Sequence, residues 1–204
     1  MSGVDLVNKN AFNQMPKLPA SNFNLPNSIT FLRIVLIPVF IWVFSQPTPE
    51  RAFWSVVIFL GAALTDFLDG YLARKSGQVT NLGKLLDPVA DKLLVASGLI
   101  LLVQFQRVSV WLAIVLIARE LIVTGARMVA AREGLVVAAD GTGKIKVVAQ
   151  ISGIVCLVAI GIVESMDHWL LEIGNMMLYL ALGFSLWSAW GYLSGIAKKI
   201  GPQW

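Results

Sequence analysis

The chain has 204 residues, of which 57% are hydrophobic and only 14% are charged, and it carries a formal net charge of +4. A soluble domain is about half apolar and about a quarter charged, so this composition excludes an ordinary soluble globular protein. Continuous apolar stretches of about 20 residues are typical of membrane-spanning helices, whereas the strands of a membrane barrel alternate with period two. The sequence therefore predicts an all-α integral membrane protein.

Residues 1–26 precede the first long apolar stretch and lack the basic start and apolar block of a cleavable signal peptide. Their few apolar residues fit either a short amphipathic helix lying on the membrane interface or a flexible segment. We expect a single domain of six transmembrane helices over residues 27–197. A basic tail is expected over residues 198–204.

The six predicted transmembrane helices follow in chain order over residues 29–44, 52–71, 86–104, 109–131, 147–163 and 169–192. Lysine and arginine gather in the N-terminal segment, the second and fourth connections and the tail, which all lie on one side of a six-helix protein. By the positive-inside rule we expect both termini in the cytoplasm and a multi-pass protein of the cell (inner) membrane. A positive face suits anionic membrane lipids and anionic substrates, so no nucleic-acid partner is expected.

Four aspartates stand where the second predicted helix ends and the third begins. Asp66 and Asp69 are spaced i, i+3, and Asp87 and Asp91 are spaced i, i+4, so each pair shares one face of its helix. The connection between the two helices is short and basic, which makes them pack antiparallel. Both pairs are therefore expected at the cytoplasmic boundary, facing each other.

Four carboxylates that converge on one small volume repel each other, and some would protonate unless cations were bound. Two divalent ions neutralise the four charges, and oxygen ligation without nearby histidine or cysteine favours Mg²⁺ or Mn²⁺ over Zn²⁺. The alternative is that the aspartates are solvated residues at helix ends, paired with neighbouring cations. Two pairs at helical spacing on adjacent helices favour the metal site.

The aspartates and the small or basic residues around them form a longer motif. Its spacing resembles the signature of the CDP-alcohol phosphotransferases at every element: Asp66-x2-Asp69-Gly70-x2-Ala73-Arg74-x8-Gly83-x3-Asp87-x3-Asp91. The resemblance implies a six-helix membrane fold with its site facing the cytoplasm and two bound divalent metals. It also implies transfer of a phosphatidyl or similar group from a CDP-linked donor to an alcohol, with release of CMP.

Other segments resemble the members of this family that use glycerol 3-phosphate as acceptor. The similar stretches are NLPNSITFLRIVLIP (24–38), DPVADKLLVA (87–96), ARELIVTGAR (118–127), GKIKVVAQ (143–150) and LWSAWGYL (186–193). This resemblance implies that CDP-diacylglycerol donates its phosphatidyl group to the hydroxyl of sn-glycerol 3-phosphate. Val147 departs from the pattern, because threonine usually stands there, and this weakens any expectation of a hydroxyl contact.

The resemblance also implies roles for individual residues. Asp66, Asp69 and Asp87 would be the main metal ligands, and Asp91 would touch a metal and take the proton from the acceptor hydroxyl. The CDP-linked donor would contact Asp66 and Asp69 together with residues around them and at the start of the first helix: Gly70, Ala73, Arg74, Gly83 and Thr30.

Four cations in the fourth and fifth predicted helices suit the phosphate of the acceptor. Arg119 lies inside the fourth helix, Arg127 follows two turns later on nearly the same face, and Lys144 and Lys146 open the fifth helix. Glu120 is expected to point elsewhere, because consecutive helical residues lie about 100° apart. The alternatives are that the lysines only set the membrane orientation and that Arg119 pairs with Glu120 or an aspartate.

The signature is compatible with two other functions. One is a related enzyme that uses inositol phosphate, serine, choline or phosphatidylglycerol as acceptor. The other is a divalent-cation transporter, which the position of a single acidic cluster near one membrane face disfavours. Glycines in the last two helices predict close helix contacts or the seam of a homodimer: Gly153, Gly161, Gly174, Gly183 and Gly191.

Overall fold

A computed structural model of the chain describes the backbone of residues 25–46, 48–76, 81–132 and 142–200. Within these ranges it describes the side chains of residues 31–46, 48–65, 89–130 and 145–195. The N-terminal segment predicted over residues 1–26 lies almost wholly outside the described residues, and its two alternatives stay predictions.

The described residues form six α-helices and one short 3₁₀ helix, and they contain no strand. In chain order these are α2 (Leu25–Phe44), α3 (Pro49–Ser76), α4 (Asn81–Gln104), α5 (Val110–Arg132), α6 (Thr142–Val158), η1 (Glu164–Met166) and α7 (Asp167–Ile200). Each predicted apolar segment corresponds to one α-helix, so the all-helical prediction is confirmed for this part of the chain. Several helices continue past the predicted apolar segments into polar residues, because polar residues also form helices.

The fifth predicted helix ends too late. It was expected to reach residue 163, whereas α6 ends at Val158 and a turn leads to η1. Gly161 lies in this turn with φ +93°, a conformation that favours glycine. The Asp167 carboxylate accepts a hydrogen bond of 2.8 Å from the Gly161 backbone N–H, which fixes the turn.

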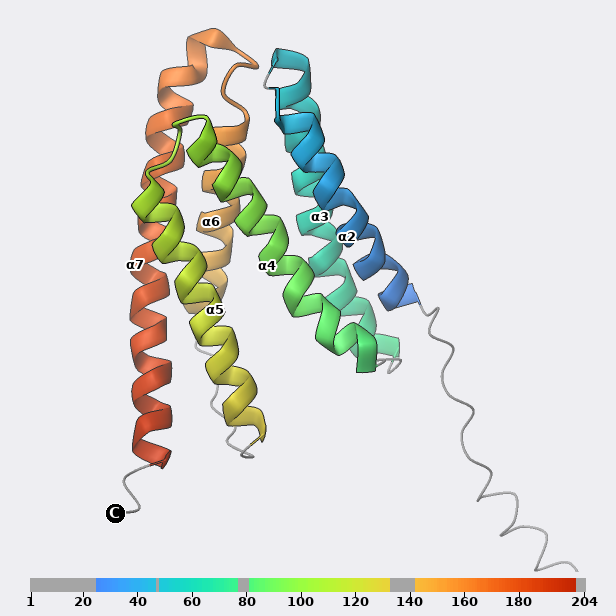
Figure 1. Cartoon of the computed structure of the whole chain (residues 1–204), viewed down its shortest axis with the longest axis vertical. Helices are drawn as coiled ribbons and strands as arrows, with labels where there is room; N and C mark the ends of the chain where they lie inside the picture. The colour runs from blue at the N-terminus through green and yellow to red at the C-terminus, as the bar shows by residue number, and fades with distance from the viewer. Residues whose placement is uncertain (1–24, 47, 77–80, 133–141, 201–204) are drawn as a thin grey trace, which may run out of the picture.

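The six α-helices run roughly along the long axis of the molecule (Figure 1). α6 packs along α7, α2 packs against α3 and α4, and α5 contacts α4 and α7. The α2–α3, α4–α5 and α6–α7 connections lie at one end, at the top of Figure 1, which we call the closed end. From their connection, α4 and α5 diverge toward the opposite end, which we call the open end.

Aromatic packing fills the core near the closed end. Phe40 and Phe44 of α2 are fully buried and stack with ring centroids 5.8 Å apart. Phe59 of α3 packs on Phe40 at 5.4 Å, and Phe105, after α4, meets Phe44 edge-on at 5.3 Å. These contacts join α2, α3 and the α4–α5 connection into one hydrophobic cluster.

Two glycines allow α6 and α7 to approach each other closely. A Cβ atom at Gly174 would lie 2.6 Å from Leu157 Cγ, and one at Gly153 would lie 2.9 Å from the Gly174 carbonyl oxygen. The predicted close contact is therefore confirmed for these two residues. A Cβ atom added at Gly183 or Gly191 would meet no described atom outside its own helix within 4 Å. The homodimer seam therefore stays a prediction.

The outer surface of the bundle is apolar. Six tryptophans are exposed on it, at 51–79% of their full surface: Trp42, Trp54, Trp111, Trp169, Trp187 and Trp190. Such extensive exposure of large apolar side chains is typical of a surface that lipid covers. By length and composition, one stretch of the described residues, Glu164–Gly195, is suited to cross a membrane, and two shorter apolar helical stretches are Phe31–Phe44 and Ile145–Val158.

Candidate functional site

The four aspartates of the motif lie on two neighbouring helices. Asp66 and Asp69 belong to α3, which ends at the open end, and Asp87 and Asp91 belong to α4, which begins there (Figure 1). The two helices are antiparallel and in contact, so the predicted helical placement of both pairs is confirmed. The side chains of several predicted site residues lie outside the described residues, and their roles stay predictions: Asp66, Asp69, Asp87, Ala73, Arg74, Thr30 and Lys144. The same holds for what surrounds Gly70 and Gly83.

Asp91 is the aspartate of the motif whose side chain the structure describes. The side chain is 44% exposed, and one carboxylate oxygen, Oδ2, accepts a hydrogen bond of 3.1 Å from Lys92 Nζ. Asp91 lines a cavity of about 520 Å³ between α4, α5 and α6. A carboxylate in this position is accessible to a molecule that enters the cavity.

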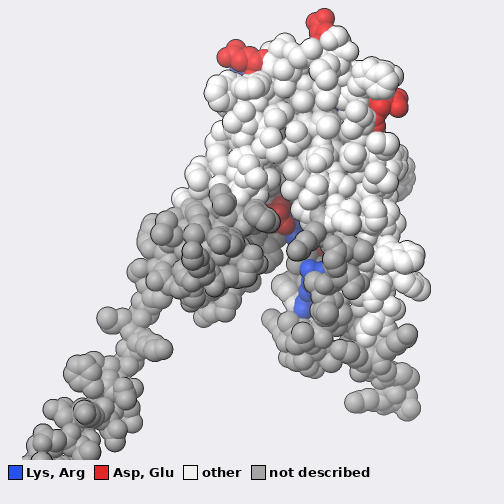
Figure 2. All heavy atoms as spheres, turned by 180° about the vertical axis from the view of Figure 1, so that it is seen from behind, with Lys and Arg blue, Asp and Glu red and all other residues white. Residues whose placement is uncertain are grey.

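The cavity combines apolar walls with a charged group of side chains. Val89, Leu93, Leu121 and Ile151 are among the residues that form the walls, and Asp91, Lys92, Glu120 and Lys146 supply the charges. Figure 2 shows charged atoms of both signs inside a recess at the open end, below a largely uncharged surface. Such a space suits a molecule that is apolar in one part and anionic in another.

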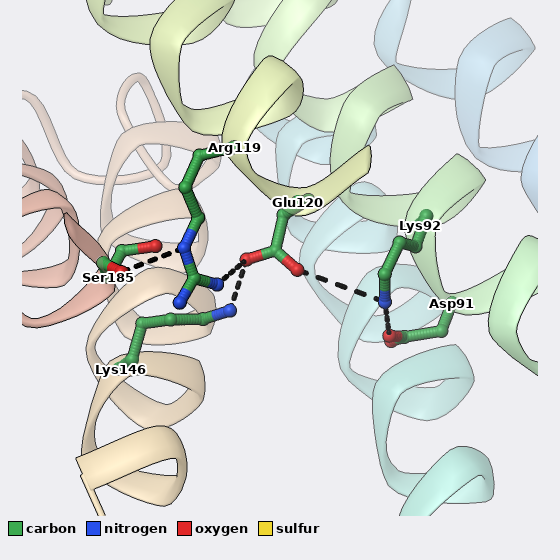
Figure 3. A network of polar contacts seen from close by, with 6 residues as sticks. All are labelled: Asp91, Lys92, Arg119, Glu120, Lys146 and Ser185. Carbon is green, nitrogen blue, oxygen red and sulfur yellow. Dashed lines mark hydrogen bonds and ion pairs between the residues drawn. The ribbon is translucent and has the colours of Figure 1, made fainter. Parts of the chain in front are cut away.

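Glu120 of α5 lies at the centre of the charged group (Figure 3). Its Oε1 accepts hydrogen bonds from Lys146 Nζ and, at 3.2 Å, from Arg119 Nη1. Its other oxygen, Oε2, lies 3.8 Å from Lys92 Nζ. One carboxylate therefore faces three cations, which come from α4, α5 and α6.

The prediction that Glu120 points away from Arg119 is wrong. The angle of about 100° separates the two Cα–Cβ directions, but both side chains are long enough for their charged ends to meet. Burial makes the contact favourable, because Arg119 is only 8% exposed and a buried charge needs partners. A carboxylate among cations within an apolar stretch was the signal in the sequence that indicated this pairing.

The three predicted acceptor cations whose side chains the structure describes do not all line the cavity. Lys146 lines the cavity, whereas Arg119 lies behind it and donates from Nε to the Ser185 carbonyl of α7 at 2.8 Å. Arg127 is exposed, and its guanidinium carbon lies 5.4 Å from the centre of the Tyr192 ring of α7. Of the described cations, Lys146 and Lys92 are those that line the cavity beside Asp91.

Comparison with known proteins places these observations in a family. Residues 23–187 match the sequence profile described as CDP-alcohol phosphatidyltransferase. The chain is 42% identical over 184 residues to the CDP-diacylglycerol–glycerol-3-phosphate 3-phosphatidyltransferase of Bacillus subtilis (strain 168), covering 84% of this chain and 94% of the relative. Proteins of the same name from Haemophilus influenzae (strain ATCC 51907 / DSM 11121 / KW20 / Rd) and Escherichia coli (strain K12) are each 37% identical, over 86% and 89% of this chain and 94% and 99% of the relatives.

Proposed function

The chain belongs to the CDP-alcohol phosphatidyltransferase family, and we propose that it transfers the phosphatidyl group of CDP-diacylglycerol to the hydroxyl of sn-glycerol 3-phosphate. The products are phosphatidylglycerophosphate and CMP. Relatives at 37–42% identity are named for this reaction, and they cover most of the chain. The observation that carries the proposal is the cavity that Asp91 and Lys146 line together.

The family is divalent-metal dependent, and the donor set of this chain fits a hard divalent cation. Two antiparallel helices in contact carry four carboxylates at one end, and such oxygen ligands suit Mg²⁺ or Mn²⁺. We propose that Asp66, Asp69, Asp87 and Asp91 hold two such ions. When bound, the ions supply positive charge that stabilises the attacking and leaving oxygens of the transfer.

Asp91 is the proposed general base. The hydroxyl oxygen of the acceptor forms a bond to the phosphorus that carries the diacylglycerol, and the bond from that phosphorus to the CMP oxygen breaks. The hydroxyl proton goes to the Asp91 carboxylate. Its partial exposure to the cavity supports this role, because a base must lie within hydrogen-bond reach of the proton that it takes.

The remaining motif residues are proposed to bind the two substrates. The CDP part of the donor would lie against Gly70, Ala73, Arg74, Gly83 and Thr30, with Asp66 and Asp69 close to its diphosphate. The phosphate of glycerol 3-phosphate would bind the cations near the cavity: Lys146, Arg119, Lys144 and Arg127. Lys146 is the cation of this set best placed for a direct contact, because it lines the cavity that Asp91 also lines.

We further propose that α2–α7 cross the cell (inner) membrane six times, with both termini and the open end facing the cytoplasm. The apolar outer surface supports this arrangement, as do the six α-helices among the described residues. The acyl chains of the donor would stay among the membrane lipids while its diphosphate reaches the open end. A water-soluble acceptor could then meet a lipid donor at this boundary.

CMP release tests the proposal directly. The purified chain in detergent micelles, supplied with CDP-diacylglycerol and Mg²⁺, should release CMP when glycerol 3-phosphate is added. Serine, inositol phosphate, choline and phosphatidylglycerol, offered in turn at the same concentration, should give far less. Preferred transfer to any of these four would assign a different acceptor, and CMP release with none of the five would contradict the proposed activity.

A further inference from the structure

Glu120 has no role in the reaction as proposed above, yet it contacts three of the cations near the cavity. Lys146 and Arg119 donate to the same oxygen, and Lys92 faces the other. The Glu120 side chain is 17% exposed, so water contributes little to its neutralisation. The carboxylate is therefore held in place by three cations, two of which, Lys146 and Arg119, have also been proposed to bind the acceptor phosphate.

The charged group carries one net positive charge. Its two carboxylates, Glu120 and Asp91, face three cations: Lys92, Arg119 and Lys146. A dianionic phosphate that enters the cavity must compete with Glu120 for Lys146, because both anions need the same ammonium group. Glu120 thus occupies the position that the phosphate would take.

Glu120 also connects the proposed base to the proposed acceptor site. Lys92 Nζ lies 3.1 Å from Asp91 Oδ2 and 3.8 Å from Glu120 Oε2, so its charge is shared between the two carboxylates. Lys92 therefore contacts both carboxylates, and the charged group extends without a break from Lys146 to the proposed base.

We propose that Glu120 is a positioning residue that holds the acceptor-site cations before the phosphate binds and then yields Lys146 to it. This inference rests on the proposed function. The Glu120 carboxylate weakens binding of the acceptor phosphate, because both anions compete for the Lys146 ammonium group.

The test uses Glu120→Gln, which keeps the shape of the side chain and removes its charge. We expect the Kd for glycerol 3-phosphate, measured by calorimetry without donor, to fall about tenfold. A role limited to stability would raise Kd or leave it unchanged. Glu120→Asp, which keeps the charge, should retain a Kd within about threefold of the unmodified chain.

Glu172 of α7 offers a matched control, because it is exposed and does not belong to the charged group drawn in Figure 3. Glu172→Gln should leave the Kd for glycerol 3-phosphate unchanged. If Glu120→Gln does not fold, the double variant Glu120→Gln/Lys146→Gln can replace it, because it removes one negative and one positive charge and so keeps the net charge of the group. In the Lys146→Gln background the gain in affinity should disappear, because the contested ammonium group is absent.

Binding of inorganic phosphate distinguishes this inference from the proposed function. If the unmodified chain fails to release CMP but binds phosphate more weakly than Glu120→Gln does, the proposed function fails and the competition stands. If Glu120→Gln binds phosphate and glycerol 3-phosphate no more tightly than the unmodified chain, the inference is overturned. A gain in affinity that persists without Lys146 would overturn it too.

Discussion

The closed and open ends of the bundle neutralise buried charge in different ways. At the closed end, Arg107 donates from Nη1 to the Leu157 carbonyl at 2.7 Å, and its own carbonyl accepts a hydrogen bond of 3.1 Å from Asn175. The Arg107 guanidinium also lies 5.6 Å from the Phe44 ring and 5.8 Å from the Phe105 ring. Backbone carbonyls and core aromatic rings are fixed parts of the fold, so the contacts of this arginine are structural.

At the open end, the described cations that line the cavity are balanced by other side chains. Lys146 and Lys92 have carboxylates as their partners, and these line a cavity of about 520 Å³. A carboxylate can be replaced by a phosphate without leaving a cation unpaired. A cation that binds a substrate needs a partner that the substrate can replace, such as a carboxylate. A structural cation needs partners that stay fixed, such as backbone carbonyls and buried rings.

Burial acts on the closed-end charge as well. It lowers the pKa of the Arg107 guanidinium from its usual value, and the carboxylate of Asp167 opposes this shift. An arginine keeps its proton at any physiological pH, so the hydrogen bond to Leu157 is expected to persist throughout that range. Four predictions test whether the two ends differ in function as they differ in chemistry.

The largest effect is expected at the proposed base. Asp91→Asn should lower kcat for CMP release by roughly 100-fold or more, because general-base catalysis contributes about that much. Donor binding, measured by retention of radiolabelled CDP-diacylglycerol, should be largely preserved. Near-normal turnover of Asp91→Asn would remove this residue from the catalytic role.

The next effect concerns the cation that lines the cavity. Lys146→Met should raise the half-saturation concentration of glycerol 3-phosphate by roughly 30-fold or more, because a buried partner of the phosphate is lost. The half-saturation concentration of CDP-diacylglycerol should change much less. Equal changes for both substrates would indicate a general disturbance of the open end.

A third prediction concerns the closed half of the bundle. Gly174→Ala should destabilise the protein by about 1–3 kcal/mol, because the added methyl group would overlap Leu157. Gly183→Ala is the control, since no described atom lies within 4 Å of its Cβ position. Melting temperatures in detergent should fall for the first variant alone, with kcat per folded molecule unchanged at a temperature below both transitions. A loss of kcat without a loss of stability would contradict the division between the two ends.

The smallest effect is expected at Arg127. Its guanidinium rests on Tyr192 and is exposed, so it can act on the acceptor only from outside the cavity lining. Arg127→Ala should raise the half-saturation concentration of glycerol 3-phosphate by about threefold, through a weak and salt-screened attraction. An unchanged value would exclude Arg127 from acceptor binding, and an effect as large as that of Lys146→Met would place it in direct contact.

The helices could be predicted from the sequence because each apolar segment is long and bounded by polar residues. The end of α6 could not, because Gly161 and Asp167 form a turn inside a continuously apolar stretch. The helical spacing of the aspartates likewise predicted which helices carry them. Spacing concerns backbone directions, so it predicts which helix carries a residue and not what its side chain contacts.

The pairing of Glu120 with Arg119 was one of the stated alternatives and is confirmed, but the contacts of Glu120 with Lys146 and Lys92 were missed for the complementary reason. Arginine, lysine and glutamate are long, and their charged ends can meet across several ångströms of helix surface whatever their Cβ directions. Lys92 reaches both Asp91 and Glu120 in this way. Arg33 of α2 is another example, since it is fully buried and donates from Nε to the Ala62 carbonyl of α3 at 3.2 Å. Contacts of this kind depend on how helices pack, which a single sequence does not encode in a readable pattern.

We propose that α3 and α4 bring four carboxylates together around two divalent ions beside the open-end cavity. Titration of the metal-free chain with Mn²⁺, followed by electron paramagnetic resonance, counts these ions while CMP release is measured in the same samples. We predict two bound Mn²⁺ per chain, activity that rises as the sites fill, and loss of both signals in Asp66→Asn. Full CMP release in thoroughly chelated buffer, or Mn²⁺ binding that Asp66→Asn leaves intact, would contradict this account.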